Sequence, residues 1–420
     1  MARVKKIVLA VVVLILLSQI PFAYRRYRLG RLHAAIQSLQ SNSRKSQTQS
    51  AENLKSIDSD DTFYDYKGVV HVHSFLGGHS TGTFQEILSA AESNHLQFVV
   101  MTEHVEGEFD TSVMTLKGEH ANVLFVNGNE VSASDGERLL SLPGDISLTG
   151  SSKLPATEIV ANSRARSAFS IAAYPQEMKN ADAGADGLEV YNVFTNARTI
   201  NPIVAFFDGL WSYRTYPDLV FANYLQRPAE ALNIWDAMLA RRKVVATAGN
   251  DAHSNVGISL NDASGNEIVG LKLDPYRVSF ALVRLHVLIP GVPVDSMLER
   301  QRLDERLLLD ALAAGHCFIG FDFLGDPGTF RFEAISGQDR KIQGDEIVLQ
   351  SDTHLRIVLP VSSRLMIFHD GKVWLDENGV TNKDIAVSER GVYRVEVYLP
   401  HLGKPVGDKP WIISNPIYVK

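Results

Sequence analysis

The sequence predicts an α/β protein with an apolar helix at its amino terminus and a small all-β domain at its carboxyl terminus. Three observations support this fold class. Positions 7–24 are uncharged, apolar segments alternate with helical patterns over 63–326, and short alternating segments separated by turn signals fill 327–420. Strands separated by helices indicate βαβ units in a parallel sheet or barrel, and closely spaced alternating strands indicate a β-sandwich.

The apolar run at the amino terminus extends from Ile7 to Tyr24 and centres on VLAVVVLILL. At about 1.5 Å per residue it is nearly as long as the ~30 Å hydrocarbon core of a bilayer is thick. A cleaved signal peptide is the main alternative, but Ile20-Pro-Phe-Ala23 is a poor cleavage site. We therefore expect residues 1–30 to form an uncleaved anchor in the lipid bilayer.

The orientation of this anchor does not follow from charge, because basic residues flank both ends of the run. A single amino-terminal span before a long exported domain is the common arrangement. We therefore expect a membrane protein whose body is periplasmic or otherwise extracytoplasmic. Residues 31–62 are rich in Ser, Gln, Asn and charge, with no large apolar face after Leu39, and this composition predicts a flexible tether.

Charge and cysteine content exclude some functions. Residues 1–45 hold nine Lys and Arg and no Asp or Glu, although the whole chain has a net charge of −7. The rest of the chain is therefore strongly acidic, and we expect no nucleic-acid partner. The single cysteine, Cys317, excludes an intrachain disulfide and a cysteine-based zinc site.

The body is expected to begin with an apolar strand over 69–73. A helix follows, because Thr83 and Glu86 form a capping box and apolar residues recur at helical spacing from Ile87. Further segments share short apolar or amphipathic patterns. They predict strands at 98–102, 123–126, 170–174, 188–192 and 244–248, and a helix at 228–242. The all-β domain from 327 contains the turn signals Asp370-Gly371 and Asn378-Gly379.

Imidazoles and carboxylates recur where the body's strands end. In His71-Val-His73 and Asp251-Ala-His253, residues two apart along an extended chain share a face and can reach one point. In barrel-like α/β folds the active site forms at the carboxyl ends of the strands. The candidate metal ligands are His71, His73, His79, His104, Glu130, Asp251 and His253.

This mixture of imidazole and carboxylate without thiolate suits Mn²⁺, Zn²⁺ or Fe²⁺. Such ions acidify bound water and polarise a carbonyl or phosphoryl oxygen. One HxH pair alone is more often incidental. Recurrence at the same end of successive strands favours a metal site, because so many buried polar groups are costly without an ion. Several ligands on one rim suit two ions, with Glu130 between them.

The ordered motifs HVHS, TEH, GNE and GNDAH resemble the PHP domain family, named for polymerases and histidinol phosphatases. The resemblance covers about Val69 to Asp322. It implies a distorted (β/α)7 barrel with two or three divalent ions and, for most members, cleavage of phosphoesters. By resemblance, His71 and His73 match the first motif, His79 its later ligand, His104 the TDH motif, Glu130 the bridging glutamate, and Asp251 and His253 the last motif. Residues 186–192 also resemble the family's strand that ends in Asn.

Two positions depart from the family pattern. Where the family often has a histidine after the bridging glutamate, this chain has a turn over 135–139. Where the family has a histidine before a proline, this chain has Tyr174. In the family both histidines serve the same ion, so we expect two ions and loss of the third. Glu137 or Tyr174 is a possible replacement ligand, although each is more simply not one.

The predicted function is that of a metal-dependent hydrolase, a phosphoesterase first, in which a metal-bound hydroxide attacks a small-molecule ester. Four residues would hold one ion and three the other, with Asp251 and Glu130 as catalytic residues. The first set is His71, His73, Glu130 and Asp251, and the second is His79, His104 and His253.

Two alternatives stay open at this point. Residues 391–397 and 410–419 resemble the tail of an exported PHP branch that includes carbaryl hydrolases, which suggests hydrolysis of a carboxylic ester or a carbamate. The two departures from the family pattern instead favour a degenerate, non-catalytic envelope binding protein.

Overall fold

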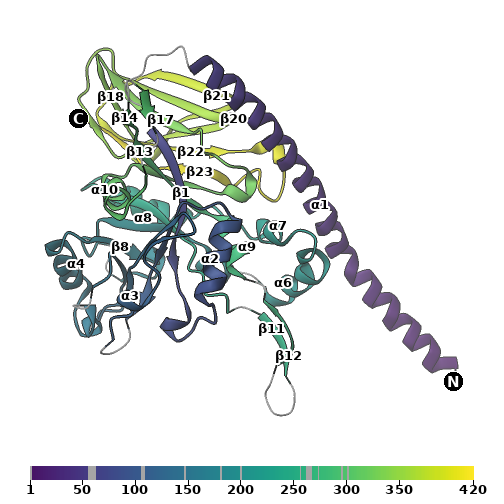
Figure 1. The fold of residues 1–420 in the computed structure, drawn as a ribbon. Coiled ribbons are helices and arrows are strands. Elements are labelled where there is room, and N and C mark those ends of the chain that lie inside the picture. The colour runs from purple at the N-terminus through teal and green to yellow at the C-terminus, as the bar shows by residue number, and fades with distance from the viewer. Residues whose placement is uncertain are drawn as a thin grey trace.

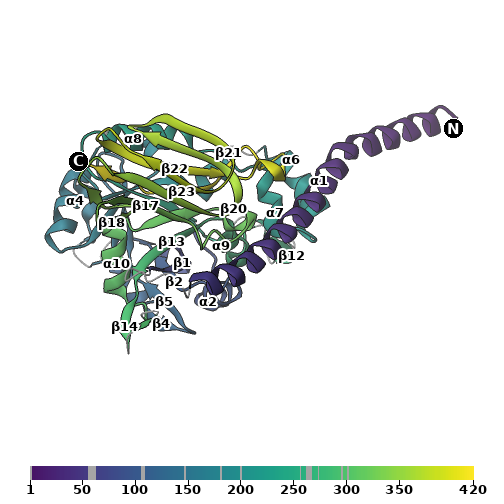
Figure 2. The same cartoon turned by 90° about the horizontal axis from the view of Figure 1, so that it is seen from above.

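The protein has a mixed α/β fold with one long apolar helix at its amino terminus. The computed structural model describes residues 2–54, 63–105, 109–145, 148–179, 182–198, 201–255, 257–261, 267–272, 274–294, 297–299 and 302–420. Figure 1 shows the carboxyl-terminal strands gathered at one end of the body and the long helix α1 running along its side. The amino-terminal end of α1 extends beyond the body, and Figure 2 shows the same from above.

Helix α1 (Ala2–Leu54) joins the expected anchor and the expected tether in one element. We expected a flexible tether over 31–62, but residues 31–54 continue the helix, and 55–62 lie outside the described residues. The reason is an apolar stripe: Leu29, Leu32, Ile36 and Leu39 recur on one face and are buried against the body. Burial of this stripe offsets the weak helix preference of the polar residues around it.

The larger sheet has fourteen strands and contains both the first strand of the body and the carboxyl-terminal strands. Its main path is β18 (Asp339–Ile342), β17 (Arg331–Ser336), β20 (His354–His369), β22 (Gly391–Tyr398), β23 (Pro410–Ser414), β16 (Cys317–Gly320), β13 (Arg284–Pro290), β1 (Phe63–Val72), β2 (Phe98–Met101), β5 (Val123–Val126) and β4 (Gly118–His120). Off this path lie β19 (Glu346–Ile347), β21 (Lys372–Ala386) and β24 (Ile417–Val419).

The smaller sheet has six strands and carries two further candidate ligands, His104 and Glu130. Its order is β10 (Val245–Gly249), β9 (Gly187–Asn192), β8 (Phe169–Ala173), β7 (Arg138–Leu142), β6 (Asn129–Ser132) and β3 (Glu103–His104). Backbone bonds connect the two sheets beside β1. The amide of Asn250 donates to the carbonyl of Val70 at 2.9 Å, and that of His73 donates to Ala252 at 3.1 Å.

Strand direction in these sheets is mixed. Pairs β1–β2, β2–β5, β3–β6, β8–β9 and β9–β10 are parallel, whereas β6–β7 and β7–β8 are antiparallel. The structure therefore has the expected α/β class, and the distorted (β/α)7 barrel stays a prediction. Two short hairpins stand apart from both sheets, β11 (Gly257–Asn261) with β12 (Glu267–Lys272), and β14 (Val292–Val294) with β15 (Met297–Glu299).

The helices pack around these strands. They are α2 (Phe84–Ser93), α3 (Thr111–Met114), α4 (Ala156–Ala165), α5 (Val193–Arg198), α6 (Pro202–Asp208), α7 (Pro217–Val220), α8 (Ala229–Leu239), α9 (Tyr276–Leu282) and α10 (Glu305–Ala314), together with the π-helix η5 (Gly209–Tyr213). The predicted capping box is confirmed at the start of α2, where Thr83 and Glu86 each bond the other's backbone amide.

Hydrogen bonding crosses the boundary that we expected near residue 326. Strand β16 pairs with β23, with Phe318 opposite Ser414 and Ile319 opposite Ile413. The strands expected to form a separate sandwich over 327–420 are thus continuous with the sheet that contains β1. One hydrophobic core extends through both parts and includes Trp235 from α8 and Trp411 from β23.

Candidate metal centre

The centre lies where β1, β3, β6 and β10 end. Two of its residues, His71 (φ 67°) and Asp251 (φ 49°), have left-handed backbone conformations that cost non-glycine residues energy. The β1–β2 register shifts between Val69 and Val72, so His71 lies at an irregularity in its strand. Strain of this kind persists where surrounding contacts fix it, and both side chains here point into the same cluster.

Glu130 is the hub of the cluster. Its Oε2 atom lies 3.3 Å from Nε2 of both His71 and His73, and 3.4 Å from Nδ1 of His104. All four side chains are largely buried. One carboxylate oxygen thus faces three imidazole nitrogens from two segments, an arrangement in which a carboxylate can serve two ions at once.

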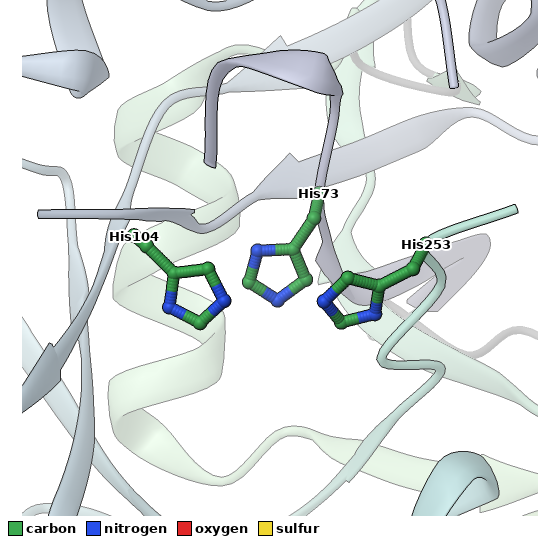
Figure 3. A group of neighbouring side chains, drawn as sticks. All are labelled: His73, His104 and His253. Carbon is green, nitrogen blue, oxygen red and sulfur yellow. The ribbon is translucent and has the colours of Figure 1, made fainter. Parts of the chain in front are cut away.

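A second group of donors adjoins the first. His73, His104 and His253 bring ring nitrogens within 4.8 Å of one another, and Figure 3 shows the three rings side by side, each from a different segment. Asp251 lies between the groups. Its Oδ1 atom is 3.5 Å from Nε2 of His71 and 3.4 Å from Nδ1 of His253.

Several donor atoms in this cluster have no hydrogen-bond partner among the described residues. They are both ring nitrogens of His73, Nε2 of His104 and Oδ1 of Asp251. Buried polar atoms without partners are costly, and a cation in the cluster would coordinate one nitrogen of each ring and Oδ1 of Asp251. The residues present therefore fit divalent metal ions, and imidazole with carboxylate suits Mn²⁺, Zn²⁺ or Fe²⁺.

The protonation states also suit a cation. Burial lowers the pKa of His73 to about 4 and that of His104 to about 3, so both rings are neutral near pH 7. Burial would raise the pKa of Glu130, but the adjacent imidazoles of His71 and His73 outweigh burial and hold it well below its usual range. Neutral imidazoles beside an ionised carboxylate are the forms that bind metals.

His71 is held by a carboxylate that the sequence did not single out. Its Nδ1 atom donates to Oε1 of Glu189 at 2.7 Å, and Asn192 donates to the other oxygen at 2.9 Å. Burial alone would lower the pKa of His71, but Glu189 and Asp251 outweigh it and raise the pKa well above its usual range. A carboxylate on the far nitrogen fixes the orientation of a ligand histidine.

Gly249 makes this contact possible. A Cβ atom at this position would lie 1.7 Å from Oε1 of Glu189, so a larger residue would displace the carboxylate from its place beside His71. A cue for Glu189 existed in the sequence, since the strand DGLEVYN ends beside the other ligand strands. The pairing with His71 spans 118 residues, however, and only the fold reveals it.

The two positions that depart from the family pattern have other partners. The hydroxyl of Tyr174 donates to Oδ2 of Asp251 at 2.8 Å, and Oε1 of Glu137 accepts from the backbone amide of Lys179 at 2.8 Å. Instead, Arg138 reaches the centre: its Nη1 donates to Oε1 of Glu130 at 3.0 Å. The side chain of Arg138 is 43% exposed. A guanidinium open to solvent thus adjoins the buried donors.

His79 lies at the edge of the cluster. Its ring centroid is 4.5 Å from that of His104 and 6.1 Å from that of His253, but the residue is exposed. Neither group of converging ligand atoms includes it. The structure brings six of the seven predicted ligands together, and a role for His79 stays a prediction.

A further group, His286 with Asp322 and Asp326, is also close enough to hold an ion. Both ring nitrogens of His286 are already bonded, to Asp65 at 2.7 Å and Asp322 at 3.0 Å. An oxygen of Asp326 accepts from Lys67 at 2.7 Å. These atoms have protein partners, so this group does not fit a metal in the way that the first two groups do.

Comparisons with known proteins give distant structural matches. No family model matches the chain, and neither does any curated protein. Solved structures that match include PsfC from Pseudomonas syringae, with 11% identity, a TM-score of 0.39, and coverage of 60% of this chain and 90% of that one. A second is from Bifidobacterium adolescentis and is provisionally assigned as a metal-dependent phosphoesterase. It has 14% identity, a TM-score of 0.30, and coverage of 45% of this chain and 88% of that one. Similarity at this level assigns no function to this chain, so the case rests on the centre itself.

Proposed function

We propose that the chain is a divalent-metal-dependent hydrolase that cleaves ester bonds, phosphoesters first. The observation that carries the proposal is the set of buried imidazole and carboxylate atoms without hydrogen-bond partners among the described residues, which converge from β1, β3 and the segment after β10. His73 and His104 are neutral beside the ionised Glu130, and these are the protonation states in which such groups coordinate cations.

In this proposal two ions share the cluster. His71, His73 and Asp251 would hold one ion, His104 and His253 would hold the other, and Glu130 would serve both. His79 adds a ligand at the exposed edge. Bound divalent ions supply an acidified water and an electrophile for the ester oxygen.

The remaining residues orient this set and receive the substrate. Tyr174 and Asn192 both donate to Oδ2 of Asp251, so that Oδ1 would be available to a cation. The pKa of Asp251 is lowered, because the neighbouring histidines outweigh its burial. It is therefore a better ligand than proton acceptor in the resting site. Arg138, half-exposed beside Glu130, is placed to bind an anionic oxygen of the substrate.

The test uses the full-length protein in lipid nanodiscs, stripped with a chelator and then supplied with Mn²⁺, Zn²⁺ or Fe²⁺. We expect metal-dependent cleavage of p-nitrophenyl phosphate or bis(p-nitrophenyl) phosphate, abolished in His71→Ala. His120→Ala is the matched control, because His120 is exposed and bonds only locally. Cleavage of p-nitrophenyl acetate alone would instead favour the carboxylic ester or carbamate hydrolase. A protein that binds no metal and cleaves none of these substrates would refute the proposal.

We also propose that α1 anchors the protein in a membrane, with the body on the extracytoplasmic side. Among the described residues, one helix is long and apolar enough to span a bilayer, within Arg3–Ser41, with a mean hydropathy of 2.5 over its most apolar window. None of that window is buried in the protein. The helix continues into a stripe packed on the body, which supports retention of the helix over cleavage as a signal peptide. Protease protection in intact cells, compared with lysed cells, tests the orientation.

A further inference from the structure

Helix α6 and the π-helix η5 expose an apolar face. Ile203, Phe206 and Leu210 are 67%, 45% and 68% exposed, and their spacing puts them on one side of the continuous helical segment. Large apolar side chains grouped on a surface are unusual unless that surface binds something. We call these three residues the apolar face of α6–η5.

A neighbouring side of the same segment packs against α1. The ring of Phe207 packs on Phe22 with centroids 5.0 Å apart, and Trp211 donates to Gln19 at 3.0 Å. Buried Asp208 accepts two bonds from Arg25, at 2.8 and 2.5 Å. Figures 1 and 2 both show α6 beside α1. The apolar face therefore has a fixed position relative to residues 19–25 of α1.

This position is the end of the apolar run in α1. The uncharged stretch stops at Tyr24, and four arginines follow within seven residues. Tyr24 and Tyr27 are exposed, and Trp211 and Tyr216 lie against the same stretch through Gln19 and Arg26. Tyrosine, tryptophan and basic residues concentrate where a span leaves the hydrocarbon region. If α1 crosses a bilayer, α6–η5 is level with its surface.

We propose that the apolar face of α6–η5 lies in the headgroup region of the bilayer that α1 crosses. This inference rests on the proposed anchor and adds a second contact with the lipid. The segment has the features of an in-plane interfacial helix, with apolar residues exposed on one side and its contacts with α1 on a neighbouring side. A single span would leave the body free to tilt, whereas a span and an in-plane helix together fix which side of the body faces the membrane.

The test places a fluorescent label at single cysteines in full-length protein in phosphatidylcholine and phosphatidylglycerol vesicles. The buried Cys317 is first replaced with serine. Labels at Leu210, Ile20 and Val373 are compared with and without lipids that carry a nitroxide quencher near the headgroup. All three side chains are exposed, and β21, which carries Val373, lies far from the amino-terminal end of α1 in both views.

We expect the Leu210 label to be quenched at least half as strongly as the Ile20 label, and the Val373 label hardly at all. Quenching at Leu210 no stronger than at Val373 would overturn the inference while leaving the anchor intact. Disulfide cross-linking between Leu210→Cys chains without quenching would assign the face to a second copy and also overturn it. Absence of quenching at Ile20 would refute the anchor and this inference together. None of these outcomes bears on hydrolysis, which is measured separately.

Discussion

At the scale of single residues, Glu130 presents its two carboxylate oxygens to different neighbours. Oε2 faces the imidazoles of three histidines, whereas Oε1 accepts a bond from Arg138. The carboxylate of Glu130 thus connects the buried imidazoles with the guanidinium of Arg138 at the surface. A substitution at Arg138 should therefore affect substrate binding more than metal binding. A substitution at Glu189, which bonds the far nitrogen of His71, should affect metal binding first.

Arg138→Gln should lower kcat/KM for phosphate esters about tenfold, equivalent to about 1.4 kcal/mol, through a higher KM. Because the guanidinium is half-exposed, we expect a smaller fall in kcat/KM than the loss of a buried ion pair would cause. Metal content and thermal stability should not change. Arg356→Gln is the matched control, because Arg356 is also 43% exposed and lies 3.1 Å from a carboxylate, that of Asp384. Steady-state kinetics with equal metal loading check this, and an unchanged KM would argue against a substrate contact.

Glu189→Gln should weaken metal binding by about 10- to 100-fold, the usual effect of losing a carboxylate behind a ligand histidine. Glutamine would keep a bond to His71 Nδ1 but turn an amide towards the amide of Asn192, which now donates to Glu189. Competition with a fluorescent chelator measures the affinity. Glu230→Gln, on the exposed side of α8, is the control. Equal affinities in both variants would mean that Glu189 does not orient His71.

Much of the centre was predictable from short spacing. HxH and DxH after apolar strands indicated His71, His73, Asp251 and His253, because residues two apart share a face. Arg138 was not predictable: attention to likely ligands pointed to Glu137, whose side chain bonds backbone instead. Which of two adjacent residues faces the centre depends on the register of β7, and a short sequence pattern does not determine that register.

At the scale of elements, a buried histidine clamps β13 to its neighbours. His286 on β13 bonds Asp65 on β1 and Asp322, which follows β16. Burial would lower the pKa of His286, but the two carboxylates outweigh it and raise the pKa from 6.5 to about 10. The folded chain therefore holds a proton here that the unfolded chain releases above about pH 6.5.

The sign of the pH effect follows from this raised pKa. The stabilisation by His286 is complete below about pH 6.5 and is lost as pH rises towards about 10, by at most about 1.4 kcal/mol per pH unit. Chemical denaturation between pH 6.5 and 9.5 should show a steeper fall in the free energy of unfolding for the natural protein than for His286→Gln. Parallel pH profiles would contradict a charged His286.

Most elements were predictable, and their junctions were less so. The capping box and the strands at 98–102 and 123–126 correspond to α2, β2 and β5. The turn predicted at Asp370-Gly371 joins β20 and β21, but that at Asn378-Gly379 lies inside β21. There the β20–β21 register shifts between Ser363 and Leu365, so the second signal marks a bulge. An Asn-Gly pair favours a left-handed backbone conformation, and both a turn and a bulge require a residue in that conformation.

At the scale of the molecule, side chains bind the body to the carboxyl-terminal strands. Arg394 on β22 makes two 2.7 Å bonds to Asp236 on α8 and one of 2.7 Å to Glu396, which also accepts from Arg227. Composition and periodicity separated two domains at about residue 326 because the element types change there. They gave no information on pairing between β16 and β23, which depends on contacts almost a hundred residues apart.

Asn415 is the side chain through which the carboxyl-terminal strands hold β10, the strand that leads into Asp251 and His253. Its Oδ1 accepts from the amide of Ala246 at 2.7 Å, and its Nδ2 donates to the carbonyls of Ala246 and Cys317 at 3.1 and 2.9 Å. Asn415 itself is fully buried. The side-chain amide of Asn415 therefore bridges β10 and β16 with hydrogen bonds of the kind that a neighbouring strand would make.

Asn415→Ala should lower the free energy of unfolding by at least about 2 kcal/mol, because it leaves buried backbone groups unpaired at a cost of about 1–3 kcal/mol each. Asn415→Asp should be at least as damaging, since a carboxylate would face two carbonyl oxygens. Asn382→Ala, at an exposed position of β21, is the control. Thermal unfolding in nanodiscs, with and without Mn²⁺, should show a lower Tm for both Asn415 variants and a smaller metal-induced rise in Tm, because β10 supports two ligands. A full metal-induced rise at a lowered Tm would show that the carboxyl-terminal strands stabilise the body without shaping the metal centre.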